Sequence, residues 1–324
     1  MSNSLTEHVK ITQTYEFIIA VDFIGNTPFF ICADGSIFYN DTKHQLHDGG
    51  ILVAHSNGKT LYTGGDDGKI IATAQDGSNT TIAHEKSRWI DAITSTKDSV
   101  AWSFAKTIRS KDSKGVIKTL ELQSSCQGLC FRPKGYMLAV AQNGGAKLWM
   151  PNTSAAPDSL EWKGSHIDVT WSPDSRFVVT SMQENQLHGW RLPEKAHMRM
   201  SGYPAKPRSF SWSMDGNWLA TSGTEAAIIW PFASKDGPTG KAPRECGVRP
   251  KRVSKVSFHP KSLVLAIGYE DGFIMLVRLT DASELVVRTI TNGKPVTALS
   301  WRPDGQQLAF GTEDGAAGVL TLPV

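Results

Sequence analysis

The stretch "FSWSMDGNWLATSGTEAAIIW", residues 210–230, is nearly repeated elsewhere in this chain of 324 residues. Close copies are "VTWSPDSRFVVTS" from Val169 and "LSWRPDGQQLAFGTEDG" from Leu299. A catalytic motif has no physical reason to recur, whereas a structural unit that must stack on its neighbours to bury an apolar face does. The stretch therefore indicates a repeat architecture.

The repeated unit has the pattern of a short β-meander. A turn residue follows the first apolar run of each copy, and successive turn residues are separated by 40, 41, 46 and 43 residues: Pro133, Pro173, Met214, Pro260 and Pro303. Apolar residues two and four positions before each turn give the period-two alternation of a strand with one buried face. Asp-Gly turns such as "GYEDG" (268–272) and "GTEDG" (311–315) indicate hairpins between the later runs.

Eight such units can be traced at a mean period of about 40 residues, which is typical of four-stranded propeller blades. Their first strands begin near Phe17, Ile51, Trp89, Cys126, His166, Arg208, Val253 and Val296. Segments such as 44–49, 79–85, 116–123, 159–164 and 285–292 supply outer strands, but the last unit has none. The unused "HVKITQ", residues 8–13, is expected to take that place and close the ring. We predict an all-β, single-domain β-propeller over residues 1–324, with eight four-stranded antiparallel blades, or seven with one irregular insertion.

These motifs resemble the WD-repeat β-propeller family from about His8 to Val324. The resemblance is carried by aromatic-x-Pro turns at 131, 171, 258 and 301, by the Asp-Gly turns, and by the strand-ending Trp149, Trp190 and Trp230. None of these tryptophans is followed by Asp, so the hydrogen-bonded tetrad that the resemblance implies (turn Asp, His, Ser/Thr and Trp) is expected to be incomplete in most blades. His166 is its nearest candidate. The repeat-equivalent tryptophans, including Trp171, Trp212 and Trp301, are expected to pack between blades.

Composition favours an ordered chain in a reducing compartment. Apolar residues make up 40%, charged residues 20%, and the net charge is only +3. This balance predicts neither nucleic acid nor a membrane as partner. The N-terminus has no signal-peptide core, no apolar run reaches membrane-spanning length, and four cysteines do not form a disulfide framework. We predict a cytoplasmic protein.

The sequence contains no recognisable catalytic motif. It lacks Gly-x-Ser-x-Gly, His-Glu-x-x-His, Cys-x-x-Cys and a phosphate-binding loop. Cys126 and His166 hold equivalent places in adjacent units, seven residues before their turn prolines. A zinc site needs three or four protein ligands, and only these two can be named. A buried Cys usually acts as a small apolar side chain. We predict no enzyme activity, no cofactor and no metal.

Candidate binding residues lie on loops that lead into first strands. The basic stretch "KAPRECGVRPKRVSK", residues 241–255, has six basic residues against one acid, Glu245. In a propeller these loops share one face with the turns between second and third strands. The proposed protein-binding residues are Arg88, Trp89, Lys206, Arg208, Lys251 and Arg252. A solvated mixed-charge rim is the competing interpretation, and burial of Trp89 between blades is another.

The sequence thus predicts a non-catalytic protein-interaction scaffold of the WD-repeat type, either a monomer or part of a hetero-complex. The alternative is a metal-handling or small-ligand-binding propeller that uses its central channel. The sequence does not identify the partner.

Overall fold

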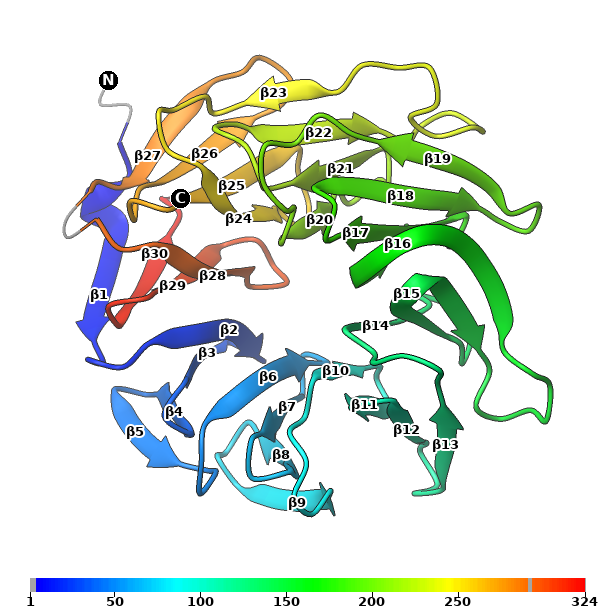
Figure 1. The fold of residues 1–324 in the computed structure, drawn as a ribbon. Helices are drawn as coiled ribbons and strands as arrows, with labels where there is room; N and C mark the ends of the chain where they lie inside the picture. The colour runs from blue at the N-terminus through cyan, green and yellow to red at the C-terminus, as the bar shows by residue number, and fades with distance from the viewer. Residues whose placement is uncertain (1–3, 291–292, 324) are drawn as a thin grey trace. The chain divides into compact units, whose positions relative to one another are not determined.

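The computed structural model describes residues 4–290 and 293–323 and is built almost entirely of strands (Figure 1). Within these residues, thirty strands form seven antiparallel sheets, and one 3₁₀ helix, η1 (Thr6–His8), precedes the first strand. The chain divides into two compact units. Unit 1 comprises residues 1–33, 37–43 and 203–324, and unit 2 comprises residues 34–36 and 44–202.

Each sheet with strands in unit 1 has four strands, and each is a β-propeller blade of the expected kind. One sheet joins β2 (Ile18–Ile24), β3 (Thr27–Cys32), β4 (Ser36–Tyr39) and β5 (Thr42–Gln45). The next joins β20 (Phe210–Trp212), β21 (Trp218–Thr221), β22 (Ala227–Pro231) and β23 (Arg244–Cys246). A third joins β24 (Val253–Phe258), β25 (Val264–Tyr269), β26 (Ile274–Arg278) and β27 (Glu284–Arg288). The fourth joins β28 (Val296–Trp301), β29 (Gln307–Thr312), β30 (Ala316–Thr321) and β1 (Val9–Gln13).

Unit 2 contains two four-stranded sheets and one sheet of six strands. The first joins β6 (Ile51–Ser56), β7 (Thr60–Gly65), β8 (Lys69–Ala74) and β9 (Asn79–His84). The second joins β10 (Ala92–Ser95), β11 (Val100–Phe104), β12 (Thr107–Lys111) and β13 (Ile117–Glu121). The third joins β14 (Gly128–Phe131), β15 (Leu138–Trp149), β16 (Asp158–Trp171), β17 (Phe177–Met182), β18 (Gln186–Arg191) and β19 (Ala196–Met200).

The structure corrects the expected number of eight separate sheets to seven. In the fourth unit, the expected second and third strands form the single strand β15. Strand β16 combines the outer strand of the fourth unit with the first strand of the fifth unit. Asn143 pairs with Ser165, in the link between the two halves of β16, and the register shifts between Asn143 and Gly145. The fourth and fifth units therefore share one sheet, which agrees with the alternative of seven.

The N-terminal strand occupies the place expected from the sequence. Strand β1 pairs antiparallel with β30, from Val9 opposite Leu320 to Gln13 opposite Ala316. Figure 1 shows the blue β1 beside the red β30, so residues from the two ends of the chain share one sheet. This pairing covers the β30 edge, which would otherwise carry unpaired backbone groups. Of the expected outer strand at 285–292, Thr291 and Asn292 lie outside the described residues.

Apolar clusters lie between neighbouring sheets within each unit. In unit 1 one cluster combines β24–β27 with β28–β30, and in unit 2 another combines the two halves of the six-stranded sheet. The strand-ending tryptophans contribute to this packing, since Trp149, Trp190 and Trp230 are buried. Trp171 and Trp301 are also buried, whereas Trp212 is only half-buried and packs edge-on against Phe232. The alternating apolar residues of the repeats thus form the core.

Candidate functional site

The loop that leads into β24, residues 247–252, is held by backbone hydrogen bonds from both sides. The Arg249 amide donates to Glu225 O at 2.9 Å, and the Val253 amide donates to Thr224 O at 2.8 Å. On the other side the Glu270 amide donates to Arg252 O at 2.9 Å. These bonds confirm, for this part of unit 1, that turns between second and third strands contact the loops that lead into first strands.

Arg249 fixes the loop further by turning its side chain inward. Its guanidinium lies over the Phe273 ring at 3.6 Å from the centroid, and 5.4 Å from that of Tyr269. It also forms an ion pair of 3.5 Å with Asp271. A cation held against an aromatic face and a carboxylate is a stable anchor. The neighbouring side chains therefore project from a loop with little freedom to rearrange.

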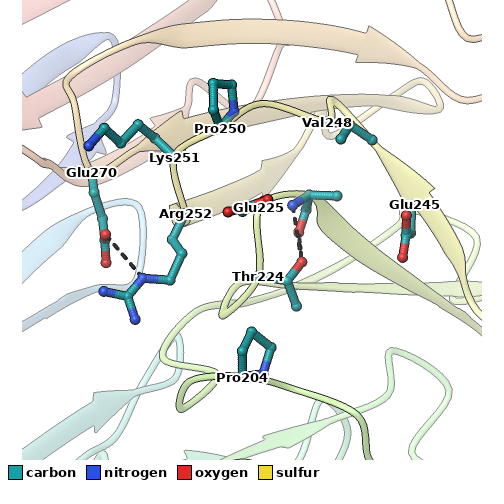
Figure 2. A pocket seen from close by; sticks show the side chains of 10 residues that line it. Pro204, Thr224, Glu225, Glu245, Val248, Pro250, Lys251, Arg252 and Glu270 are labelled. Atoms are coloured by element: carbon teal, nitrogen blue, oxygen red, sulfur yellow. Dashed lines mark hydrogen bonds and ion pairs between the residues drawn. The ribbon is translucent and has the colours of Figure 1, made fainter.

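The outward side chains of this loop line a surface pocket of about 570 Å³ (Figure 2). Lys251, Arg252, Pro250 and Val248 line it together with Pro204, the turn residues 224–226, Glu245 and Glu270. Arg252 Nε donates to Glu270 Oε2 at 3.2 Å, the contact drawn in Figure 2. Val248, which also lines the pocket, is 68% exposed. The pocket, which we call the β24 pocket, thus combines apolar surface with charges of both signs.

The remaining predicted binding residues lie outside this pocket. Lys206 is half-buried and Arg208 is exposed on the loop before β20, but neither lines the β24 pocket. In unit 2, Arg88 and Trp89 are both exposed on the loop between β9 and β10. Trp89 is 68% exposed, so the expectation that it is buried between blades is wrong. The loop turns outward at Ser87, whose φ is +58°.

Cys126 and His166 do not come together as a metal centre. Burial raises the pKa of the Cys126 thiol to about 12, and the thiol donates to Gly128 O at 3.5 Å. Both ring nitrogens of His166 have protein partners, Thr180 Oγ1 at 2.7 Å and Trp162 O at 3.0 Å. Within the described part of the chain, no three His, Cys, Asp or Glu side chains are placed to hold a metal ion.

Sequence reasoning missed His47, which forms the tetrad-like network of the sheet β6–β9. Its Nδ1 lies 3.0 Å from Asp67 Oδ1, and its Nε2 lies 2.9 Å from Thr63 Oγ1. His166 has the Thr180 partner, but Glu184, not Asp, stands in its turn and accepts from the Ser165 amide. The signal for His47 was its position four residues before Ile51, together with Asp67 in "GGDDG". The sequence pattern places that histidine in an outer strand, whereas β5 ends at Gln45.

Comparison with known proteins finds a WD40 domain family and several relatives of low identity. The family described as Anaphase-promoting complex subunit 4 WD40 domain matches residues 256–322. THO complex subunit 3 of Arabidopsis thaliana is 25% identical over 61% of this chain. Periodic tryptophan protein 2 of Saccharomyces cerevisiae is 21% identical over 62%, and Protein HIR1 of Kluyveromyces lactis is 25% identical over 49%. The chain spans 62% of the length of the first relative, 26% of the second and 22% of the third.

Solved structures share the fold at low identity. The computationally designed Ika8 protein matches with a TM-score of 0.79 and 18% identity, over 96% of this chain and 98% of its own. A chain of the Mitotic Checkpoint Complex matches with a TM-score of 0.69 and 13% identity, over 85% of this chain and 91% of its own. None of the described residues forms a helix long and apolar enough to cross a membrane. The repeats, the four-stranded blades and these matches support a WD-repeat β-propeller for this chain.

Proposed function

We propose that this chain is a non-catalytic protein-interaction platform and that a protein partner docks on the β24 pocket. The observation that carries the proposal is Val248, an exposed apolar side chain on an anchored loop, in the same pocket as Lys251, Arg252 and Glu270. Interfaces gain most from anchors that are already held in place, because little side-chain and loop entropy is then lost on binding.

Exposed Trp89 and Arg88 of unit 2 are proposed as a second contact, since Trp and Arg are enriched among energetically dominant interface residues. Lys206 and Arg208 are proposed to assist binding through long-range electrostatic attraction between their positive charges and acidic groups of the partner. One curated relative is by name a subunit of the THO complex, which supports a role in a protein complex. Nucleic acid and membranes are not part of the proposal.

The experiment compares proteins captured from cell extract by the wild-type chain and by the double variant Lys251→Glu/Arg252→Glu. We expect a partner to be lost or depleted with the variant. With the purified partner, association should be slowed, and the effect should shrink as salt rises, because exposed charges act mainly on the rate of encounter. Fold stability should change by less than about 0.5 kcal/mol, since both side chains are exposed on a loop.

The matched control reverses two charges in unit 2, Lys111→Glu/Lys114→Glu, and should retain the partner. Equal capture by wild type and by the Lys251/Arg252 variant would contradict docking at the β24 pocket. If Trp89→Ala alone abolished capture, the partner would bind the β9–β10 loop instead. Metal analysis of untagged protein tests the alternative of a metal-handling propeller, which stoichiometric metal would favour.

We further propose that residues 1–324 act as one propeller domain closed by the β1–β30 pairing, and that the chain is cytoplasmic and either monomeric or part of a hetero-complex. The four free cysteines are those expected of a protein from a reducing compartment. A single cooperative unfolding transition would support one domain, and two separate transitions would contradict it. Fluorescence microscopy of the tagged chain tests the location.

A further inference from the structure

A second pocket, of about 380 Å³, opens beside strand β27 in unit 1, away from the residues of the β24 pocket. Its apolar lining comes from two neighbouring sheets and from the C-terminal segment: Val264, Leu276, Leu285, Trp301 and Leu322. Leu276 and Trp301 belong to the buried cluster between these sheets, and Val264 and Leu322 pack against it. The pocket is thus an unfilled part of the groove between β24–β27 and β28–β30.

The chain fills another part of the same groove with its own N-terminal residues. Leu5 is a buried member of the same cluster as Leu276 and Trp301. Its amide donates to Val286 O at 2.7 Å, and Ser4 forms a parallel bridge with Val286. An extended segment that pairs with β27 and inserts one apolar side chain is therefore a binding mode that this groove already accommodates.

Strand β27 is also an edge strand. It is the last strand of its sheet, and within residues 4–290 and 293–323 the only bridge on its outer side is the one to Ser4. Leu285, next to that bridge, is 37% exposed and lines the pocket. A sheet edge that accepts an extended segment beside an apolar pocket is the arrangement through which proteins add a strand from a partner, with backbone bonds giving affinity and the pocket giving specificity.

We propose that the β27 groove binds an extended segment of a partner protein, which continues the pairing begun by Ser4 and places an aliphatic side chain in the pocket over Trp301. Two charged side chains of opposite sign line the pocket: Arg278 is paired with Asp281 at 2.6 Å, and Glu284 is exposed. Because opposite charges favour each other across paired strands, the partner segment carries Lys or Arg next to its aliphatic residue. This surface is separate from the β24 pocket, and the proposal does not depend on the proposed function.

The experiment selects binders from a phage-displayed library of random eight-residue peptides, using the intact chain as bait. Selected peptides are then synthesised and titrated by fluorescence polarisation. We expect an aliphatic residue beside Lys or Arg, an at least tenfold weaker affinity for Leu285→Arg, and weaker binding by Glu284→Lys. Methylation of the peptide backbone amide that pairs with β27 should weaken binding to a similar degree, because it removes a hydrogen bond and leaves the side chains unchanged.

The control variant is Leu52→Arg, which alters an equally exposed leucine on β6 and should leave affinity within twofold of wild type. Lys251→Glu/Arg252→Glu should also leave peptide affinity unchanged, so failure of the β24 pocket and failure of this groove are distinguishable. The proposal is overturned if selection yields no peptide, or if Leu285→Arg or backbone methylation leaves affinity intact. It is also overturned if sedimentation velocity finds a dimer that Leu285→Arg dissociates, because the occupant would then be a second copy.

Discussion

Acidification is predicted to destabilise unit 2 through one buried histidine. His188, on β18, is fully buried and stacks on the Trp162 ring at 3.9 Å between centroids. Neither of its ring nitrogens has a hydrogen-bond partner among the described residues. Burial, together with the smaller effects of the nearby His166, His197 and Arg199, lowers the pKa of His188 to about 3. The folded chain therefore holds this ring neutral well below neutral pH.

The sign of the pH effect follows from the unfolded chain. There the imidazole has its ordinary pKa of 6.5, so below this pH the unfolded chain binds a proton that the folded chain excludes. Stability from this group is complete above pH 6.5 and falls progressively as the pH drops toward 3. Between pH 7 and pH 5 the free energy of unfolding should fall by about 2 kcal/mol on account of His188 alone. Burial also lowers the pKa of His166, which adds a loss of the same sign.

The assay is urea unfolding at pH 7 and pH 5, followed by tryptophan fluorescence. The variant His188→Phe keeps an aromatic ring for Trp162 to stack on and removes the titrating group. Its stability should depend less on pH than that of the wild type, by about 2 kcal/mol over this interval. His84→Gln, at an exposed position, is the control and should behave as wild type. Equal losses for wild type and His188→Phe would refute the assignment.

Three further predictions concern stability and surface exposure. Deletion of residues 1–13 removes β1, exposes the β30 edge and should lower the melting temperature or cause aggregation, seen by light scattering; an unchanged melting temperature would contradict this. Tyr203→Phe should cost about 1–3 kcal/mol in urea unfolding. The Tyr203 hydroxyl lies 2.6 Å from Thr221 Oγ1 and accepts from Trp230 Nε1 at 2.7 Å, and the change leaves both buried groups short of a partner. Trp89→Ala should change stability by less than about 0.5 kcal/mol because the side chain is exposed, and a larger loss would mean that the ring is buried in solution.

The strands could be predicted from sequence because their pattern is local. Seven of the eight first strands expected from period-two alternation and Asp-Gly turns begin within three residues of an observed strand start. Ile51, Val253 and Val296 coincide with one. The shared sheet of the fourth and fifth units could not be predicted, because it depends on a long-range backbone approach. Asn143 pairs with Ser165, where β16 continues from the outer strand of the fourth unit into the first strand of the fifth. Only the folded chain reveals that "QNGG" passes so close to β16.

The candidate site was partly predictable for a similar reason. The basic stretch predicted Lys251 and Arg252 at a loop surface, and the structure places both on the β24 pocket. Arg249 is one of the six basic residues of that stretch, but its charge alone does not show that its side chain turns inward to the Phe273 ring and acts as an anchor. Nor does the sequence single out Val248, since an isolated valine in a sequence carries no information about its exposure.

In three sheets the loop that leads into the first strand carries a buried polar residue, and the type of this residue differs between the sheets. This residue is His47 in one sheet, Glu85 in the next and Tyr203 in another, and each hydrogen-bonds a later strand of its own sheet. Glu85 accepts from Trp102 Nε1 at 2.9 Å, as Tyr203 accepts from Trp230. Each of these blades needs a buried polar side chain that reaches the later strand, and several residue types can supply it. Without that side chain its hydrogen-bond partner would be buried and unpaired, which costs more free energy than the bond contributes. This buried hydrogen bond fixes the loop at the start of the strand. The exposed residues of the same loop can then vary without loss of the fold, and Trp89 is one of these exposed residues.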